Sequence, residues 1–176
     1  MLGNQAVFLV LIIAELGLVI GLSMAIDRLS AATAAMLFMV YSVLNGLTLS
    51  VIFVIYQLGS IYAAFFVAGA MFGVMAVIGY TTKRDLTGLG SLAMMGLVGV
   101  VIASVVNLFL ASSMLYWIVT YVGVAVFVGL TAYDVQKIRQ MSEQGLTGEQ
   151  QGRYAVLGAL RLYLDFVNLF LLSLRS

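Results

Sequence analysis

The chain has 176 residues, of which 64% are hydrophobic and only 9% are charged, and its formal net charge is +1. A soluble domain carries roughly a quarter of charged residues, so this composition excludes a water-exposed globular fold and indicates an integral membrane protein. The few basic residues are scattered rather than gathered into a patch, so nucleic acid is not an expected partner. Cys and His do not occur, so zinc, haem and iron–sulfur sites are not expected, and no cofactor is predicted.

Hydropathy predicts six segments that each approach the roughly 20 residues a helix needs to cross a bilayer. Their apolar runs are continuous and do not alternate as the strands of a barrel would. The sequence therefore predicts an all-α integral membrane protein in which residues 1–176 form a single polytopic membrane domain. The first residues lack the basic region and cleavage site of a signal peptide, so we expect mature sequence. The predicted transmembrane helices cover about 4–26, 31–56, 60–80, 89–111, 114–135 and 154–174.

The first predicted helix contains one carboxylate, Glu15, close to the middle of the membrane. Two interpretations stay open: Glu15 lines an ion pathway, or its carboxyl group is hydrogen-bonded to a neighbouring helix. The second predicted helix carries a row of side chains that can hydrogen-bond between helices, namely Ser42, Asn45, Thr48 and Ser50. Two glycine pairs predict faces on which helices pack closely, namely Gly17 with Gly21 and Gly69 with Gly73.

Basic residues are confined to alternate connections between the predicted helices. The connections after the first, third and fifth helices carry all of the basic residues outside the last helix and its end. Under the positive-inside rule this side is cytoplasmic, so we expect an integral protein of a bacterial cytoplasmic (inner) membrane. The only sizeable polar loop, residues 138–153, is predicted to be cytoplasmic, with three glycines as helix breakers. The basic residues on this side are Arg28, Lys83, Arg84, Lys137, Arg139 and Arg153.

The last predicted helix is almost wholly apolar and yet carries Asp165 in its middle. Helical periodicity places Arg161, Asp165 and Asn168 on one face. A carboxylate inside a membrane is rare unless it faces a protein interior or a water-filled path, so we predict that the other helices surround this one. Asp134, near the cytoplasmic end of the fifth helix, is predicted to complete the site.

Two carboxyl groups brought together in a site of low dielectric constant tend to share a proton and to titrate as a pair. Asp134 and Asp165 are thus candidates for a pH sensor, and their oxygens also suit a hard cation such as Ca²⁺. The alternative is that each carboxylate pairs with a nearby base, Asp165 with Arg161 and Asp134 with Lys137. Arg161 either neutralises Asp165 or extends toward the cytoplasmic surface. Arg28 either caps a carboxylate at the cytoplasmic mouth or only determines the topology.

Four stretches carry motifs that extend over much of the chain. They read GYTTKRDLTGLGSLAMMGL (79–97), SVVNLFL (104–110), GLTAYDVQKIR (129–139) and GALRLYLDFVNLFLLSLR (158–175). The sequence resembles the Bax inhibitor family of membrane proteins, also called the transmembrane Bax-inhibitor-motif family, in a bacterial-type form. The YD-x-Q-K-I and LYLDF-x-NLFL motifs are the specific part of this resemblance.

The resemblance implies a fold of seven helices, in which the last helix is surrounded by the other six, and a pH-sensitive Ca²⁺ leak. It implies that Asp134 and Asp165 form a hydrogen-bonded proton-sensing pair, and that Arg28 is a latch on Asp134 in the closed state. Members of the family usually have one more helix before the first segment found here, so six transmembrane helices are expected in this chain. Arg161 departs from the family pattern and is expected to lower Ca²⁺ affinity or conductance.

The leading hypothesis is a Ca²⁺ leak channel that serves calcium homeostasis and stress response, gated by protonation of Asp134 and Asp165. Its expected partners are the lipid bilayer, Ca²⁺ and protons. The alternative is a membrane modulator that binds a membrane-anchored protease or a cell-death regulator through loop 138–153 without conducting ions. An intramembrane aspartyl hydrolase is disfavoured, because Asp134 follows Ala132–Tyr133 rather than a GxGD signature, and no enzymatic activity is predicted.

Overall fold

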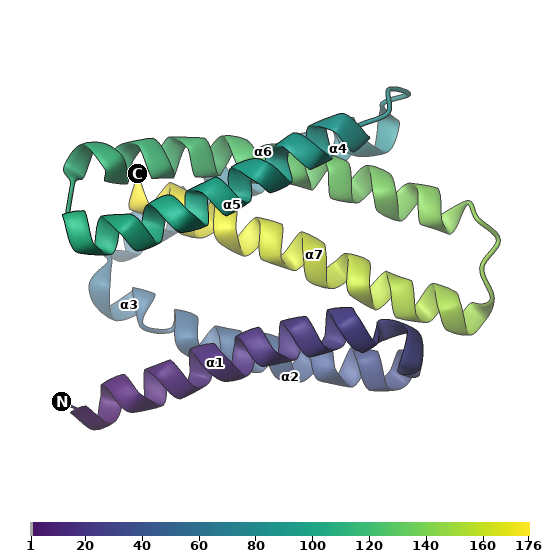
Figure 1. The fold of residues 1–176 in the computed structure, drawn as a ribbon, viewed down its shortest axis with the longest axis horizontal. Helices are drawn as coiled ribbons and strands as arrows, with labels where there is room; N and C mark the ends of the chain where they lie inside the picture. The colour runs from purple at the N-terminus through teal and green to yellow at the C-terminus, as the bar shows by residue number, and fades with distance from the viewer. Residues whose placement is uncertain (1) are drawn as a thin grey trace. The chain divides into compact units, whose positions relative to one another are not determined.

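The computed structural model describes residues 2–176, without the side chains of residues 2–9 and of Ile12. Within this range all regular structure is helical (Figure 1). Five stretches of the described residues are long and apolar enough to cross a membrane: α2 with α3, then α4, α5, α6 and α7. The predicted all-α membrane fold is therefore confirmed. The elements are α1 (Leu2–Ala25), the 3₁₀ turn η1 (Ile26–Arg28), α2 (Ala31–Leu49), α3 (Ile52–Ile55), α4 (Leu58–Thr81), α5 (Thr87–Leu110), α6 (Ser113–Ser142) and α7 (Gly148–Arg175).

The helices end where local side chains satisfy the backbone or where the backbone turns sharply. Ser30 caps the start of α2, because its hydroxyl accepts a hydrogen bond of 3.1 Å from the backbone N–H of Thr33. Ala111 closes α5 in the left-handed conformation, at φ 48°. Gly145 separates α6 from α7 at φ 65°, a conformation that costs glycine little. These positions set the lengths of the membrane-spanning helices.

The second predicted helix, 31–56, is not continuous. It divides into α2 and α3 at residues 50 and 51, which form a turn. The hydroxyl of Ser50 donates a hydrogen bond of 2.6 Å to the carbonyl oxygen of Leu47. A side chain that bonds back to the preceding turn in this way competes with the helical ladder, and such positions often bend a helix.

The predicted polar loop 138–153 is much shorter than expected. Helix α6 continues to Ser142 and α7 begins at Gly148, so only residues 143–147 connect the two helices. Of the three glycines taken as breakers, only Gly145 interrupts a helix, whereas Gly148 starts α7 and Gly152 lies inside it. The prediction was wrong because polar helical turns that extend beyond the membrane have the composition of a loop. The modulator hypothesis thereby loses most of the flexible segment on which it relied.

The chain divides into two compact units. Unit 1 contains Met1–Leu58 and Met141–Leu160, and unit 2 contains Gly59–Gln140 and Arg161–Ser176. Helix α7 contributes its first half to unit 1 and its second half to unit 2. The prediction of a single membrane domain stays a prediction.

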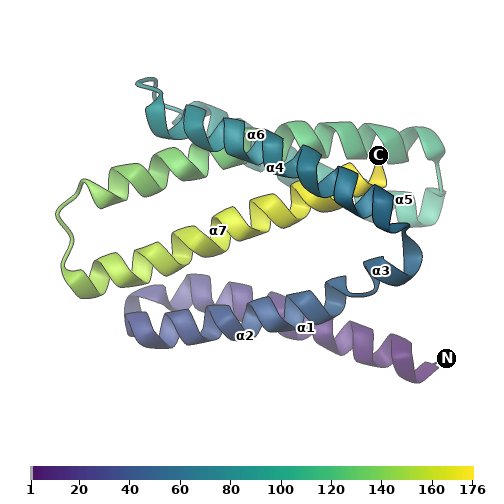
Figure 2. The same cartoon turned by 180° about the vertical axis from the view of Figure 1, so that it is seen from behind.

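Unit 1 is built on the antiparallel pair of α1 and α2, which lie side by side in both views (Figure 1 and Figure 2). The start of α7 is tied to the connection between these two helices. Arg153 donates a hydrogen bond of 2.5 Å to the backbone oxygen of Asp27, and the hydroxyl of Tyr154 donates one of 2.7 Å to the Asp27 carboxylate. Glu149 accepts a hydrogen bond of 2.6 Å from the backbone N–H of Ala31. These polar contacts join distant parts of the sequence at one end of the unit.

Unit 2 holds the apolar core, to which α4, α5, α6 and α7 all contribute. The second half of α7 packs on α4 through aromatic contacts, with Phe166 edge-to-face against both Phe65 and Phe72 at 5.6 Å between ring centroids. It packs on α6 at Gly123, where a Cβ would come within 2.9 Å of Leu172. The core residues of the unit are Ala68, Ala93, Val126, Phe127, Leu130, Leu169 and Leu172.

The second half of α7 is covered along its whole length. From residue 160 to residue 175 every side chain is buried or half-buried. The outer helices instead present large apolar side chains to their surroundings, as lipid-facing helices do; Met95 of α5 is 67% exposed and Phe66 of α4 is 71% exposed. Within unit 2, this contrast agrees with the prediction that other helices cover the last one.

The orientation of the chain stays a prediction, and the short 143–147 connection provides its test. In this chain without native Cys, we expect Gln144→Cys to resist a membrane-impermeant maleimide added outside intact cells. Gln57→Cys, which lies in the connection before α4, is the matched control and should react rapidly. Both side chains are exposed, so accessibility reports the side of the membrane rather than burial. Rapid labelling at position 144 would show that the predicted topology is wrong.

Candidate functional site

Asp134 of α6 and Asp165 of α7 meet inside unit 2. Both are buried, with 8% and 4% of their surfaces exposed, and the two side chains lie close enough to interact. Oxygen Oδ2 of Asp165 is buried and has no hydrogen-bond partner among the described residues. The site therefore retains an acceptor that a proton or a cation can use.

Two close helix contacts hold Asp134 in place. At Gly79 of α4 a Cβ atom would lie 2.2 Å from the backbone oxygen of Ala132, so only glycine fits there. At Gly90 of α5 a Cβ would lie 2.5 Å from the ring of Tyr133. The two residues before Asp134 are thus each pressed against a glycine of a neighbouring helix. Tyr133 acts here as a packing residue.

Asp165 is held by the best-packed turns of α7. Leu160 and Leu169, about one turn on either side, are 1% and 0% exposed. Arg161 lies half-buried and close enough to interact electrostatically with Asp165. The interpretation that Arg161 only extends toward the surface is therefore incomplete, and its modulating role stays a prediction.

The predicted alternative partner of Asp134, Lys137, lies elsewhere. Its ammonium group donates a hydrogen bond of 3.2 Å to the hydroxyl of Tyr133 and stands 5.5 Å from the centre of that ring. Asn168, predicted on the same face as Asp165, donates a hydrogen bond of 2.7 Å to the carbonyl oxygen of Leu164 in its own helix. Among the described residues, the neighbours that interact with Asp165 are therefore Asp134 and Arg161.

Glu15 forms a second buried polar site, within unit 1. It is 8% exposed and accepts hydrogen bonds from Asn45 at 3.2 Å and from Thr48 at 2.5 Å. Of the two interpretations left open by the sequence, the structure supports the hydrogen bond to a neighbouring helix, because both donors come from α2. These bonds join α1 to α2 where water is scarce.

Arg28 lies in η1 of unit 1, where it is exposed, whereas the two aspartates belong to unit 2. Its role as a latch stays a prediction. In the described part of the chain, no further metal ligand of the usual kind lies near the acidic pair. The described residues contain no group of three or more Asp, Glu, His or Cys side chains suited to a metal.

Sequence reasoning missed Gln136, which lies two residues after Asp134. Its amide is buried, with 6% of the residue exposed, and it binds the connection between α4 and α5 at two points. Nitrogen Nε2 donates to the backbone oxygen of Arg84 at 2.6 Å, and oxygen Oε1 accepts from the backbone N–H of Leu86 at 2.9 Å. The only signal in the sequence was a glutamine within the YD-x-Q-K-I motif.

Asp85, in the same connection, starts α5. Its carboxylate accepts hydrogen bonds from the hydroxyl of Thr87 at 2.6 Å and from the backbone N–H of Thr87 at 3.0 Å. These two bonds hold the pKa of Asp85 below its usual value, and the bond from the Thr87 hydroxyl has the larger effect. Asp85 is fully exposed and stays ionised at neutral pH, so it is not a pH sensor in this range.

Removing the Gln136 amide is expected to loosen the 82–86 connection. Gln136→Leu deletes two hydrogen bonds that hold this turn, and trypsin cleavage after Lys83 or Arg84 should accelerate about tenfold. The rate is measured by limited proteolysis of purified protein in detergent. Gln140→Leu, an exposed position one turn further along α6, is the matched control and should cleave at the wild-type rate. Equal rates for the two variants would show that Gln136 does not restrain the turn.

Fold and site together define a polytopic α-helical membrane protein with an ionisable pair buried among its helices. Residues 1–175 match the protein family described as Inhibitor of apoptosis-promoting Bax1, and the chain belongs to this family. The predicted resemblance is thereby confirmed.

Curated relatives support the same assignment. The chain is 56% identical over 178 residues to the inner membrane protein YbhL of Escherichia coli, a match that covers 99% of this chain and 76% of YbhL. An uncharacterized protein of Borreliella burgdorferi is 48% identical over 174 residues, covering 98% of this chain and 75% of that protein. One of Deinococcus radiodurans is 45% identical over 164 residues, covering 93% and 71%. The predicted location, integral to the inner membrane, is confirmed at this level.

Proposed function

We propose that this protein is a pH-sensitive leak pathway for cations, with Ca²⁺ as the transported ion, and that the Asp134–Asp165 pair is its proton sensor. The observation that carries the proposal is that two different helices bring two buried carboxyl groups together. Ionisable groups inside a membrane domain are costly, and they usually belong to ion or proton pathways.

The shared proton gives the pair two states that differ in charge. When the pH falls, the pair becomes neutral, and its attraction for a nearby cationic side chain is lost. When the pH rises, the proton leaves, and two negative charges in a buried site must be compensated by a cation. Arg161 is one available cation, and Arg28 is proposed as the other, in the role of a latch that closes the pathway at high pH.

The small number of oxygen ligands at the pair favours transient passage of Ca²⁺ over stable binding. Ca²⁺ is bound by about six to eight oxygen atoms in stable sites, whereas two carboxylates supply at most about four. The described residues offer no third acidic ligand at the pair. Water must complete the coordination of the ion, and weak binding of this kind suits a site through which ions leave as readily as they enter.

The direct test is Ca²⁺ flux into liposomes that contain the purified chain. We expect flux above that of protein-free liposomes, and we expect it to rise as the pH is lowered from about 8 to about 5, because the pair then becomes neutral. A matched measurement with K⁺ in place of Ca²⁺ reports whether the path selects divalent ions. Absence of any protein-dependent flux at all pH values would reject the proposal.

A further inference from the structure

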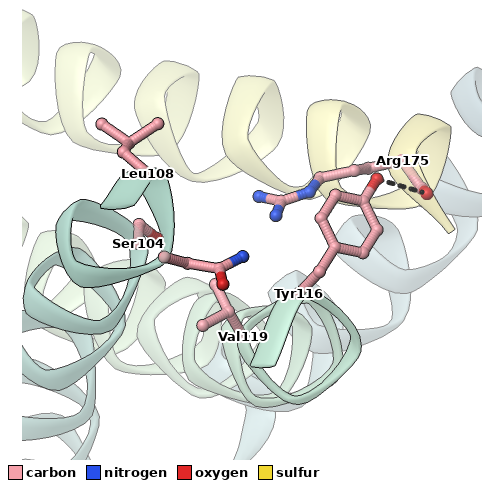
Figure 3. Close-up of a pocket in the computed structure, with 6 residues that line it drawn as sticks. Ser104, Leu108, Tyr116, Val119 and Arg175 are labelled. Atoms are coloured by element: carbon pink, nitrogen blue, oxygen red, sulfur yellow. Dashed lines mark hydrogen bonds between the residues drawn. The ribbon is translucent and has the colours of Figure 1, made fainter. Parts of the chain in front are cut away.

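A pocket that the Asp134–Asp165 pair does not explain lies where α5 ends, α6 begins and α7 ends. It has a volume of about 340 Å³, a size typical of sites for small ligands. Figure 3 shows the guanidinium group of Arg175 extending from α7 toward the residues of α5 and α6 that line the space. The lining residues are Ser104, Asn107, Leu108, Tyr116, Val119 and Arg175.

Arg175 brings a positive charge that no described side chain neutralises. Its guanidinium lies 4.0 Å from the centre of the Tyr116 ring, and the Tyr116 hydroxyl donates a hydrogen bond of 3.1 Å to the backbone oxygen of Arg175 (Figure 3). These two contacts fix the arginine at the pocket but leave its N–H groups available. No Asp or Glu occurs in the connections 50–57 and 111–112 or after Asp165. An arginine held in this way is suited to an oxyanion such as phosphate.

Asn107 supplies a second donor beside Arg175. Its oxygen Oδ1 accepts a hydrogen bond of 2.9 Å from the backbone N–H of Ser112, which closes the end of α5. Within the described residues that bond occupies the oxygen and leaves the amide N–H₂ for a ligand. A second pocket of about 360 Å³ also borders on Asn107 and Tyr116, so the open space continues past the first pocket.

The aromatic residues around the pocket are of the kind found in the headgroup region of a bilayer. Trp117 and Tyr121 stack with ring centroids 5.8 Å apart, and Trp117 meets Tyr116 edge-on at 5.6 Å. Clustered Trp and Tyr rings are typical of the membrane–water interface. Leu108 and Phe109 at the end of α5 are 81% and 85% exposed, which provides an apolar flank for an acyl chain. A free anion would make no use of this flank.

From these features we infer that the pocket binds the phosphate of an anionic phospholipid, such as phosphatidylglycerol, in the leaflet on the side opposite the predicted cytoplasmic face. Arg175 and the Asn107 amide donate to the phosphate, and the acyl chains lie along the exposed end of α5. A zwitterionic lipid such as phosphatidylethanolamine is disfavoured, because its ammonium group would approach the arginine. This inference is independent of the proposed ion leak.

The single Trp of the chain, Trp117, is a native probe beside the pocket. The purified full chain is placed in nanodiscs with brominated phosphatidylglycerol or brominated phosphatidylethanolamine at equal mole fraction, and quenching of Trp117 fluorescence is measured. We expect an apparent affinity about five- to tenfold higher for the anionic lipid, the size expected for a charge-assisted hydrogen bond at a partly exposed site. Equal quenching by the two lipids would overturn the inference.

Variants distinguish lipid binding at this pocket from a general attraction between basic residues and anionic lipid. Arg175→Gln should abolish the preference, Arg175→Lys should retain most of it, and Lys83→Gln, at the opposite end of the helices, should leave it unchanged. Asn107→Asp keeps the acceptor for Ser112 but adds a negative charge, and it should lower the preference with the fold intact by circular dichroism. A preference that persists in Arg175→Gln would overturn the inference. So would its loss on addition of inorganic phosphate at an ionic strength matched with chloride, since the site would then be one for free phosphate.

Discussion

Asp134→Asn is expected to leave Ca²⁺ flux high and nearly independent of pH between about 5 and 8, because asparagine cannot ionise and so cannot return the site to its closed, charged state. Asp165→Asn should flatten the pH response as well, with lower flux, because it removes an acceptor from the ion path. Arg28→Ala should resemble Asp134→Asn, because it removes the positive charge proposed to close the pathway. The measurement is Ca²⁺ uptake by liposomes across this pH range.

Asp85→Asn is the matched control for these variants. Asp85 is exposed, and its hydrogen bonds with Thr87 hold its pKa below the usual value. It is therefore ionised throughout the range tested, and its contribution to stability would be lost only at more acidic pH, as the pH falls through the lowered pKa. The variant should keep the wild-type pH response. A well-folded Asp134→Asn protein with an unchanged pH response would end the proposal that the pair is the sensor.

Gly79→Ala is expected to be strongly destabilising. The added Cβ would lie 2.2 Å from the backbone oxygen of Ala132 and 2.9 Å from its Cα atom. A backbone atom cannot turn away as a side chain can, so α4 and α6 must separate. We expect a loss of about 2–4 kcal/mol in the free energy of unfolding, seen as a melting temperature lower by roughly 5–10 °C in detergent. Because Asp134 follows Ala132 by two residues, the carboxyl pair should be disturbed as well.

Gly73→Ala, in the same helix, is the matched control. No atom of the described residues lies within 4 Å of a Cβ built at this position. Alanine favours the helix over glycine by about 0.5–1 kcal/mol, so the variant should be as stable as the wild type or slightly more stable. Similar melting temperatures for the Gly73 and Gly79 variants would contradict the close contact between α4 and α6.

The helices and the charged site residues could be predicted from the sequence alone. Apolar runs of membrane-spanning length must form helices, because a backbone in lipid has to satisfy its own hydrogen bonds. Asp165 in the middle of such a run had to be covered by other helices, and Asp134 was the other carboxylate near it in the membrane. These predictions depend on the free energy of placing one helix, or one charged side chain, in a membrane. That free energy follows from the local sequence alone.

The contacts between helices were decided only by the tertiary structure. The paired glycines Gly69 and Gly73 predicted a packing face, yet a Cβ at either position would meet no described atom. Close approaches to α6 occur instead at Gly79 and Gly90. Gln136 was likewise indistinguishable from an ordinary polar residue at a helix end until its contacts with the α4–α5 connection were known. Where two helices cross depends on the packing of all their side chains together, and no local spacing in the sequence specifies that point.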